Sequence, residues 1–340
     1  MNSGGAGSGG RATIEDVSRA AGVSIKTVSR VLNQERYVSG TTRDKVNAAV
    51  ASLGFRPSFA ARALAGKRSF QIALIYDNPS PYYAQNIQNG VRETCAARGY
   101  RMIAQPAHAG SADLINEVAN LIDQAQLDGL ILTPPFTEHA VLRDMLTARH
   151  LAYVTVSPAE VTPVVSSVTI DQRAAAAAMT RYLISLGHCR IGFVSGDPRF
   201  ETTERRLQGY RDALRDVGIA YDAELVEPGE YDLTSGIRAG FALMQHPNPP
   251  TAIFASSDDM AAGVLAAAHS RGVAVPGKLS VAGFDDTDLA RVVWPPLTTV
   301  RQPVHQFGAV AAELLLALPD KIEQRLLEFE LITRESVAAL

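Results

Sequence analysis

Cysteine is almost absent from this sequence. Only Cys95 and Cys189 occur among the 340 residues, and neither stands at the spacing of a metal-binding motif. Disulfide scaffolds and structural zinc sites need several cysteines or histidines at short spacings. We therefore expect no disulfide, no bound metal and no cofactor, and we expect both thiols to be free and buried.

Long apolar runs are missing too. No stretch approaches the roughly 18 uninterrupted apolar residues of a membrane-spanning helix. Residues 1–10 also lack the charged and then apolar layout of a secretory signal. The sequence therefore predicts a cytoplasmic protein with no membrane partner.

Recognisable catalytic motifs are lacking as well. The chain has no phosphate-binding loop pattern, no paired histidines of a zinc protease, no nucleophile elbow and no plausible Cys/His pair. The segment GAGSGG at 5–10 matches the spacing of a dinucleotide-binding fingerprint, but it follows no predicted strand. We expect no catalytic residues and a protein that is not an enzyme.

The net charge of −3 hides two regions of opposite sign. Residues 11–68 contain 11 Lys and Arg against 4 Asp and Glu, a net charge of +7. Residues 69–340 contain 21 against 31, a net charge of −10. Because a basic module is attracted to phosphates and an acidic one is repelled, this division indicates a small module that meets nucleic acid and a larger one that does not.

The hydrophobic pattern of residues 12–53 predicts three short helices. Gly22 supplies a tight turn between the first two, and Ser24 can cap the second, which is the arrangement of a helix-turn-helix. Ser39 can cap a third helix that ends at Gly54. The side chains expected in a shared core are Ile14, Val17, Ala20, Ala21, Val28, Val31, Leu32, Val46, Ala49, Val50 and Leu53.

From residue 69 onward, short apolar strands alternate with helical stretches. The strand-like runs are 71–76, 100–105, 128–133, 151–156, 190–195, 251–256 and 279–284. Buried strands separated by helices predict parallel, doubly wound sheets. Because this number of units exceeds one ordinary sheet, we expect two α/β lobes.

The predicted second helix has a polar, basic face opposite Val28 and Val31. That face consists of Ile25, Lys26, Ser29, Arg30 and Asn33. A helix that reads the major groove needs long hydrogen-bond donors near its N-terminus, and Lys or Arg to guanine is the commonest specific contact. The pattern alone favours an ordinary solvated surface, because short amphipathic helices are weakly specific.

Residues 12–57 resemble the DNA-binding headpiece of the LacI/GalR family of repressors almost without gaps. The matching segments are ATIEDVSRAAGVSIKTVSRVLN and YVSGTTRDKVNAAVASLGFRP. The resemblance implies that bases are chosen by Ile25, Lys26 and Arg30. It implies that phosphates and register are held by Thr13, Ser24, Thr27, Ser29 and Asn33. Lys26 departs from the small or amide residues frequent at its position, which leaves the operator preference open.

The resemblance also gives a role to the basic, alanine-rich linker at 58–68. Its segment from Ser58 to Leu64 matches a hinge helix, and Leu64 matches the leucine that enters the minor groove and kinks the duplex. The implied partners are a pseudo-palindromic operator on double-stranded DNA and a second copy of the chain in a homodimer. Such a protein acts at the nucleoid.

In the α/β part, we look for ligand contacts after the strands, because ligands of open α/β sheets bind beyond the carboxyl ends of the strands. The family resemblance continues to residue 337, for example in ERRLQGYRDAL and VPGKLSVAGFDDTDLA. It implies effector contacts by Tyr82, Tyr83, Phe200, Thr202, Arg206, Tyr231, Ser257, Asp285 and Gln302. Gln302 is a weaker member of this set, and Thr155 is a further weak candidate because sugar-binding relatives can carry a carboxylate at its position. Arg206 and Asp285 are the best supported, since a fork of donors and a fixed carboxylate together can read hydroxyls or ring nitrogens.

The predicted architecture is an all-α helix-turn-helix headpiece followed by an α/β sensor of two doubly wound parallel-sheet lobes, similar to a periplasmic binding protein. The expected limits are a flexible tail at 1–10, the headpiece at 11–57, the hinge at 58–68 and the effector-binding and dimerisation domain at 69–340. In that domain, we expect lobe 1 at about 69–166 and 300–327, and lobe 2 at about 167–299 and 328–340.

The predicted function is a sequence-specific transcriptional repressor whose binding to DNA is set by a small molecule held between the lobes. A sugar or sugar derivative is the expected effector. Two alternatives stay open. One is a regulator that responds to a purine or nucleoside, and the other is a two-lobed solute-binding protein that does not bind DNA.

Overall fold

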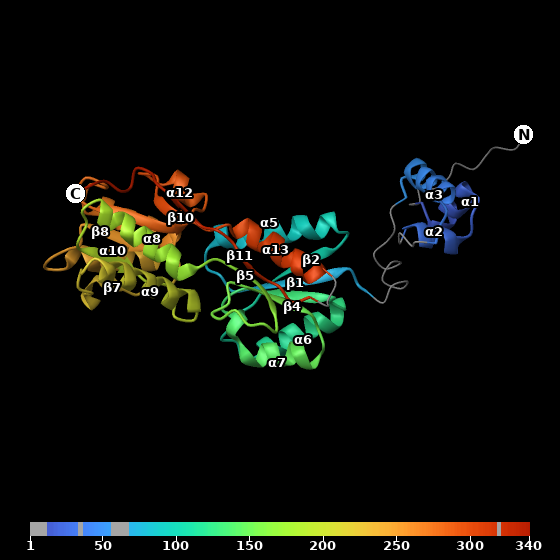
Figure 1. Ribbon diagram of the computed structural model, residues 1–340, viewed down its shortest axis with the longest axis horizontal. Helices are drawn as coiled ribbons and strands as arrows, with labels where there is room; N and C mark the ends of the chain where they lie inside the picture. Colours follow the sequence, from blue (N-terminus) through green and yellow to red (C-terminus); the bar gives the residue numbers. More distant parts are fainter. Residues whose placement is uncertain (1–11, 33–36, 56–67, 318–320) are drawn as a thin grey trace, which may run out of the picture. The chain divides into compact units, whose positions relative to one another are not determined.

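The computed structural model describes residues 12–32, 37–55, 68–317 and 321–340. The chain divides after Ser69 into two compact units, a small unit of helices and a larger α/β unit (Figure 1). The predicted tail and most of the predicted hinge lie outside the described residues. So do three positions predicted to contact DNA, which are Asn33, Ser58 and Leu64.

The described residues of the small unit form three helices, α1 (Ile14–Ala21), α2 (Ile25–Leu32) and α3 (Gly40–Leu53). Gly22 ends α1 in the left-handed conformation, at φ 65°, which a glycine adopts without steric penalty. The side chains of Ser24 and Ser39 accept hydrogen bonds from the N–H groups of the first turns of α2 and α3. The predicted turn and both predicted caps are therefore confirmed.

Six side chains form the buried core of this unit: Val17, Val28, Val31, Val46, Ala49 and Phe55. Two core predictions were wrong, because Ala20 is exposed and Leu53 keeps 39% of its surface exposed. The chain reverses at Gly54, at φ 58°, and the N–H of Phe55 donates to the carbonyl of Val50. This reversal buries Phe55 in place of Leu53.

The larger unit contains two six-stranded sheets with the same strand arrangement. The first has the order β2 (Arg101–Pro106), β1 (Gln71–Tyr76), β3 (Gly129–Leu132), β4 (Tyr153–Val156), β5 (Ser166–Thr169) and β11 (Gln324–Leu326). The second has the order β7 (Val226–Glu227), β6 (Ile191–Val194), β8 (Ala252–Ala255), β9 (Ser280–Asp285), β10 (Thr298–Arg301) and β12 (Glu330–Ile332). Neighbouring strands run parallel, except for β10 and β12. We call the first sheet with its helices lobe 1 and the second lobe 2, and the two predicted lobes are confirmed.

All seven strands expected from the sequence are present. Five others were not expected, namely β5, β7, β10, β11 and β12. Strands β5 and β10 consist mainly of Ser and Thr although most of their residues are buried, and β7 has only two residues. The side chains of β11 are all exposed. None of these strands offers an apolar run, which is the signal that identified the others.

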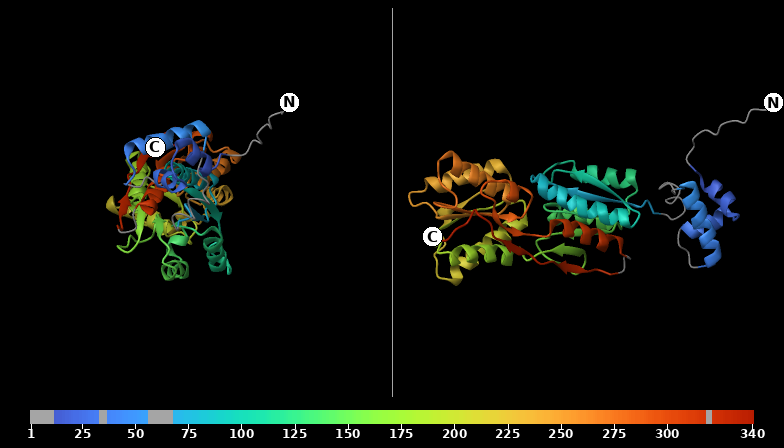
Figure 2. Two further views of the ribbon diagram at one scale, coloured as in Figure 1. Left: turned by 90° about the vertical axis from the view of Figure 1, so that its right-hand side faces the viewer. Right: turned by 90° about the horizontal axis from the view of Figure 1, so that it is seen from above.

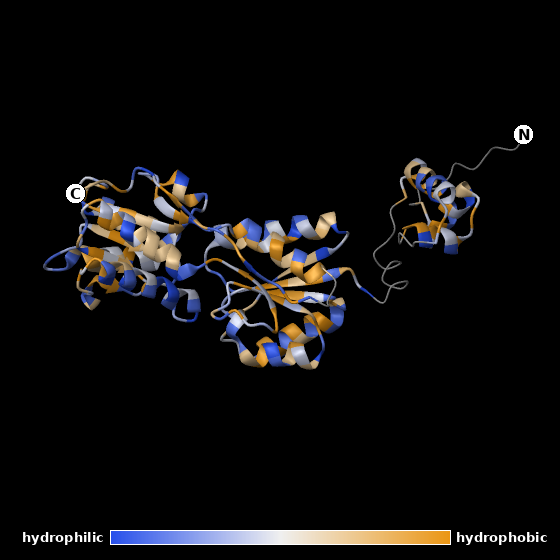
Figure 3. Ribbon diagram, viewed as in Figure 1, coloured by the Kyte–Doolittle hydropathy of each residue, from blue (hydrophilic) through white to orange (hydrophobic). Residues whose placement is uncertain are grey.

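Helices cover both faces of each sheet (Figure 1, Figure 2). In lobe 1 these are α5 (Pro81–Ala97) and α13 (Val304–Leu316) on one face, and α6 (Leu114–Ala125) and α7 (Ala140–Ala148) on the other. In lobe 2 they are the pairs α8 (Gln172–Ser185) with α9 (Glu201–Asp216), and α10 (Leu233–Gln245) with α11 (Asp258–Ser270). The short elements are η1 (Phe136–Glu138), η2 (Ala223–Leu225) and α12 (Leu289–Val292). Hydrophobic residues gather on the strands and the inner sides of the helices (Figure 3).

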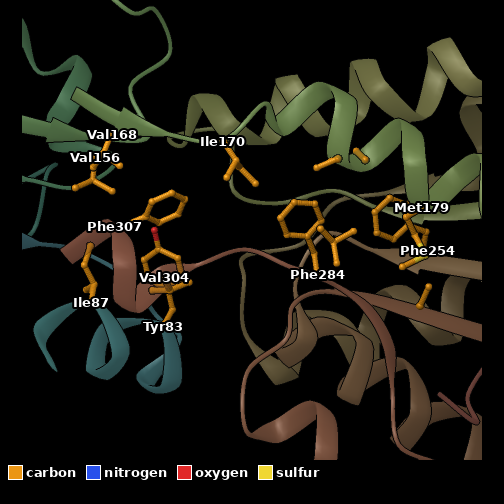
Figure 4. Packing of buried hydrophobic residues seen from close by; sticks show 14 of the residues in the cluster. Tyr83, Ile87, Val156, Val168, Ile170, Met179, Phe254, Phe284, Val304 and Phe307 are labelled. Carbon is orange, nitrogen blue, oxygen red and sulfur yellow. The ribbon is translucent and has the colours of Figure 1, made fainter. Parts of the chain in front are cut away.

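The chain crosses between the lobes three times, after β5, after β10, and between β11 and β12. One hydrophobic core runs through both lobes beside these crossings. Ile170, at the first crossing, lies between Phe307 of α13 and Phe284 of β9 (Figure 4). The lobes are therefore joined by packing as well as by covalent connection, which keeps the carboxyl ends of their strands facing one cleft.

Candidate functional site

The exposed face of α2 is the first candidate site. Ile25 is 46% exposed, and Lys26 and Arg30 are exposed as well. They lie opposite Val28 and Val31, whose burial fixes which way the helix faces. The small core therefore presents a long aliphatic side chain and two cations together, which is the composition that a major-groove contact requires.

Most of the smaller polar residues predicted to hold phosphates make contacts within the headpiece. Thr13 and Asp16 form a capping box at the start of α1, with Thr13 Oγ1 donating to Asp16 Oδ2 at 2.8 Å. The hydroxyls of Ser24 and Thr27 are hydrogen-bonded to each other at 2.9 Å. Ser29 is half-buried. These side chains are held in place by the fold, which suits contacts that set register.

The second candidate site is a cavity between the lobes at the carboxyl ends of the strands. We call it the central cavity. It is lined by Asn78, Ser80, Tyr83, Pro134, Ser157, Gln172, Phe200, Thr202, Arg206, Tyr231, Ser257, Asp285 and Gln302. Residues 78–83 follow β1, Phe200 follows β6 and Ser257 follows β8. These strands flank the points where the strand order reverses in each sheet, which is where open α/β sheets bind ligands.

A closed ring of polar side chains forms the lobe 2 wall of the central cavity. Arg206 Nε donates to Gln172 Oε1 at 2.9 Å, and Gln172 Nε2 donates to Gln302 Oε1 at 3.2 Å. Gln302 Nε2 donates to Asp285 Oδ1 at 2.5 Å, and an ion pair of 3.9 Å between Asp285 Oδ1 and Arg206 Nη2 closes the ring. All four are at least nine-tenths buried. Such a network fixes each donor and acceptor in one orientation before a ligand arrives.

Arg206 is held by further contacts. Its Nη1 donates to the carbonyl of Ser256 at 2.5 Å, and its guanidinium lies over the Phe284 ring at 3.7 Å from the centroid. A buried cation is stable only when paired and hydrogen-bonded, and these contacts meet that requirement. Arg206 is therefore a fixed, desolvated charge at the cavity wall.

Two buried carboxyls stand beside this cation. Burial raises the pKa of Asp285 to about 7, although Arg206 and the hydrogen bond from Gln302 act in the opposite direction. Burial and the charge of Asp285 raise the pKa of Asp258 well above its ordinary range. Asp258 accepts hydrogen bonds from Thr299 and Thr287 at 2.6–3.1 Å. Strongly shifted carboxyls in a cleft are typical of functional sites.

An aromatic wall faces the polar ring. Phe200 and Tyr231 meet edge to face with their ring centroids 5.3 Å apart, and the Tyr231 hydroxyl is hydrogen-bonded to Thr203 at 2.7 Å. Tyr231 adopts φ 61°, a conformation that is unfavourable for a tyrosine. Gly196 makes room for the Tyr231 ring, because a Cβ at Gly196 would lie 2.0 Å from it. Strain of this kind is found at ligand sites, where the surroundings hold it in place.

Three contacts join the lobes around the cleft. Ser80 Oγ donates to Asp259 Oδ2 at 2.6 Å, Arg199 pairs with Asp77 at 3.2 Å, and Arg205 donates to the carbonyl of Ala159 at 3.0 Å. The central cavity has a volume of about 30 Å³, which is room for about two water molecules. Because a small-molecule ligand needs several hundred Å³, the walls must separate before one can bind.

The structure brings together eight of the nine residues predicted for the effector site. Tyr82 is the exception: it does not line the central cavity, whereas its neighbour Tyr83 does. The sequence missed Asn78, Ser80, Pro134, Ser157 and Gln172. Most of them also follow the carboxyl ends of strands, so a consistent use of that rule would have found them. Thr155 lines a neighbouring cavity.

Other expectations of the sequence can be compared with the described residues. Cys95 is buried as predicted, but Cys189 is exposed, because it lies in the turn that precedes β6. In the described part of the chain, no group of three or more Cys, His, Asp or Glu residues is placed to hold a metal ion. None of the described helices is both long enough and apolar enough to span a bilayer.

Comparison with known proteins supports this division of the molecule. Residues 13–58 match the model of bacterial regulatory proteins of the lacI family, and residues 180–337 match the model of periplasmic binding protein-like domains. Catabolite control protein A of Priestia megaterium is 35% identical over 91% of this chain and 93% of its own length. The transcriptional repressor CytR of Escherichia coli K12 is 35% identical over 97% of both chains.

Solved structures agree. The lac repressor dimer bound to operator and the anti-inducer ONPF matches 97% of this chain and 100% of its own, with a TM-score of 0.80 and 26% identity. The complex of the transcriptional regulator CelR with cellobiose matches 96% of this chain and 100% of its own, with a TM-score of 0.72 and 31% identity.

A DNA-binding headpiece joined to a two-lobed sensor with a polar cleft defines the class of ligand-controlled transcription regulators. Within that class, the chain belongs to the LacI family of bacterial regulatory proteins. The relatives named here are transcriptional regulators, and the family resemblance predicted from the sequence is confirmed.

Proposed function

We propose that this protein is a homodimeric repressor that binds a pseudo-palindromic operator and is controlled by a small molecule in the central cavity. The observation that carries the proposal is the buried ring of Arg206, Gln172, Gln302 and Asp285 at the cleft. A fixed fork of donors beside a fixed carboxylate is suited to recognise a polar ligand. No step of this function requires catalysis, and its place of action is the nucleoid.

The headpiece has a separate role for each group of its side chains. In our proposal the bases are read by Ile25, Lys26 and Arg30, which share the exposed face of α2. Thr13, Ser24, Thr27 and Ser29 hold phosphates, a role supported by their fixed positions in the caps and along the helix. Asn33, Ser58 and Leu64 complete the contact, with Leu64 as the wedge in the minor groove.

A sugar or sugar derivative is the effector that the central cavity supports best. Hydroxyl groups both donate and accept, and the wall offers Arg206 as a donor, Asp285 as an acceptor and two glutamines that do both. Phe200 and Tyr231 add an aromatic surface for the apolar face of a ring. The regulator CelR, a structural neighbour of this chain, was solved in complex with cellobiose.

A purine or nucleoside is the second candidate effector. The aromatic wall would stack on a flat base, and Arg206 and Asp285 could bind ring nitrogens. Relatives include the purine-named repressor PurR of Photobacterium profundum, which is 32% identical over 97% of this chain. Thermal stabilisation distinguishes the two candidates, because only the class of compound that binds raises the melting temperature of the protein.

Effector control follows from the position of the cavity between two lobes. A ligand that binds one lobe angle better than another shifts the population toward that angle. In a homodimer, the lobe angle sets the separation of the two hinge segments, and thereby the fit of the headpieces to two half-sites. The three contacts between the lobes are the local interactions that such a shift would rearrange.

The DNA-binding part is tested by Lys26→Ala. The full chain is titrated onto a palindromic promoter site and onto scrambled DNA of equal length at one salt concentration. A base contact predicts a loss of about 1–3 kcal/mol on the palindrome and a smaller loss on scrambled DNA. Equal losses on both would make Lys26 a phosphate contact, and no binding by the parental protein would overturn the proposal.

The effector part is tested by thermal shift of the full chain against sugars, sugar phosphates and purines. A ligand that binds only the folded state raises the melting temperature with concentration, and its hit class decides between the two candidates. Each hit is then added to the operator titration. A ligand that binds but leaves operator affinity unchanged would show that it does not regulate DNA binding, which would contradict the proposed control.

A further inference from the structure

A second cavity lies beside the central one and is much larger. We call it the side cavity. It has a volume of about 460 Å³, against about 30 Å³ for the central cavity. Its lining comprises Thr137, Glu138, Arg143, Tyr153, Thr155, Pro158, Ala159, Glu160, Thr162, Val165, Glu201 and Arg205. This volume lies within the ordinary range of small-molecule sites.

The first half of α9 separates the two cavities. Thr202 and Arg206 line the central cavity, and Glu201 and Arg205 line the side cavity. Each pair has a spacing of four residues, so each lies along one side of the helix. The remaining wall of the side cavity comes from lobe 1, and Arg205 already reaches it by donating to the carbonyl of Ala159.

Arg143, on α7, is the unusual residue of the side cavity. Its Nε is buried and has no hydrogen-bond partner, and among the described residues its guanidinium has no ion-pair partner within 4.0 Å. A buried N–H group without a hydrogen-bond partner is unfavourable, and native proteins nearly always avoid it. Arg143 is thus a half-buried cation at the wall of a polar cavity, without an ion-pair partner among the described residues.

The carboxylates of the side cavity do not meet this demand. Glu138 accepts from the N–H of Ala159 at 2.6 Å through Oε1 and from the hydroxyl of Thr137 through Oε2, and it forms no ion pair with Arg143. Glu160 and Glu201 are exposed at the cavity wall, where water screens their charges. Three carboxylates and two guanidinium groups therefore line the side cavity, and Arg143 forms an ion pair with none of the described residues.

We propose that the side cavity is a second ligand site, which binds the oxyanion of a small phosphorylated or carboxylated metabolite. Arg143 holds the oxyanion by a charge-assisted, two-pronged hydrogen bond, and Arg205 contributes a second cation from across the cleft. The hydroxyls of Tyr153 and Thr155 supply neutral contacts for the rest of the molecule.

The site has a regulatory consequence, and this part of the inference rests on the proposed function. Arg143 belongs to lobe 1 and Arg205 to lobe 2, so an anion between them binds one lobe angle better than others. It thereby changes the affinity of the central cavity for its effector, and the coupling is reciprocal. The protein would respond to two metabolites of different charge.

The test measures binding of anions to the full chain by calorimetric titration. The probes are glucose 6-phosphate, glucose, inorganic phosphate and citrate. We expect glucose 6-phosphate or citrate to bind to the parental protein and Arg143→Gln to weaken that binding by about 10- to 100-fold, because a hydrogen bond between charged groups is lost. Arg143→Lys should give a smaller loss, since the charge stays and the fork is lost.

Arg149→Gln is the matched control. Arg149 follows α7 directly, but it pairs with Asp123 at 2.7 Å outside the side cavity, and its replacement should leave anion affinity unchanged. Glucose 6-phosphate and citrate separate phosphate from carboxylate as the preferred group. Inorganic phosphate shows whether an oxyanion alone is enough for binding. Glucose, which has no oxyanion, shows whether the oxyanion is needed for binding.

Thermal melting separates a ligand role from a structural one. If Arg143 binds a ligand, the Arg143→Gln variant melts no lower than the parental protein when both are measured without anion. Added anion then raises the melting temperature of the parental protein but not that of the variant. A lower melting temperature with an unchanged shift would overturn the proposal, as would equal anion affinities of the two proteins or no binding of any probe at millimolar concentrations. These outcomes do not depend on operator binding. The proposed repressor function can therefore be wrong while the anion site is right, and the anion site can be wrong while the repressor function is right.

Discussion

The two lobes share one strand order, but only lobe 2 contributes charged side chains to the lining of the central cavity. Lobe 1 supplies neutral residues, among them Asn78, Ser80, Tyr83 and Ser157. Lobe 2 supplies Arg206 and Asp285, and the buried Asp258 stands directly behind them. The shared strand order therefore fixes where a ligand is expected to bind, while the side chains that follow each strand decide how it is recognised.

The contrast extends to how each wall is held. In lobe 2 the polar atoms of Arg206 and Asp285 are bound within their own ring, so the recognition charges are organised without lobe 1. In lobe 1, Ser157 Oγ is buried and has no hydrogen-bond partner. In the proposed function, lobe 2 is the preorganised receptor and lobe 1 is the cover that completes the contacts of a bound ligand.

The largest expected effect comes from breaking the lobe 2 wall with Arg206→Ala. Removing one partner of a buried ion pair costs about 3–5 kcal/mol of unfolding free energy, and effector binding should be lost. Urea denaturation and calorimetric titration measure the two effects. The loss of stability should be smaller at acid pH, because Asp285, with its pKa raised to about 7, then carries a proton.

Arg238→Ala is the comparison for that variant. Arg238 pairs with Glu230 at 3.1 Å on the exposed side of α10, so its replacement should cost about 0–1 kcal/mol and leave effector binding intact. An Arg206→Ala protein that is folded and binds the effector as tightly as the parent would remove lobe 2 from the recognition scheme.

The sequence predicted the lobe 2 wall better than the lobe 1 wall. Arg206 and Asp285 stand in segments that resemble the family closely, and charged residues after buried strands are conspicuous. Gln172 and Gln302 are 130 residues apart and stand at two of the chain crossings, and no local pattern shows that they meet. Contacts made only by tertiary folding are invisible to periodicity.

Helix register explains the error at Tyr82. Helix α5 begins at Pro81, and successive residues of a helix point about 100° apart. Tyr83 is therefore turned into the protein while Tyr82 is turned away from the central cavity. The sequence placed both tyrosines at the site because both follow the first strand and both match contact positions of the family. A one-residue shift of the helix start would exchange the two, and helix ends are the least certain part of a prediction from sequence.

A second way to sharpen the comparison is pH, since raised carboxyl pKa values are confined to lobe 2 among the described residues. A folded-state pKa of about 7 for Asp285 lies above the value of an unfolded Asp, so the folded protein keeps a proton that the unfolded chain releases. Stability from this group is therefore present at low pH and lost as the pH rises through about 7.

Asp285→Asn should remove that dependence. Between about pH 5 and about pH 7, the unfolding free energy of the parental protein should fall by about 2 kcal/mol more than that of the variant. Denaturation curves at the two pH values measure the difference. Asp258 and Asp259 also have raised pKa values, so part of the slope should persist. Identical slopes in both proteins would show that Asp285 titrates normally.

The smallest expected effect comes from the lobe 1 cover, with Ser157→Ala. Because Ser157 Oγ is buried without a partner, its removal should change the unfolding free energy of the free protein by less than about 1 kcal/mol, in the stabilising direction if at all. Effector affinity should fall about 2- to 10-fold, the share of one neutral hydrogen bond.

Ser167→Ala distinguishes a ligand contact from a general effect of burying an unpaired hydroxyl in lobe 1. Ser167 is 2% exposed and its Oγ also has no partner, but it lies on β5 and does not line the central cavity. Its replacement should leave effector affinity unchanged. If both replacements lower effector affinity equally, lobe 1 acts through its stability rather than through contact. If neither replacement lowers effector affinity, lobe 1 makes no polar contact to the effector at Ser157. Recognition of polar groups then rests on lobe 2 and the remaining neutral residues of lobe 1.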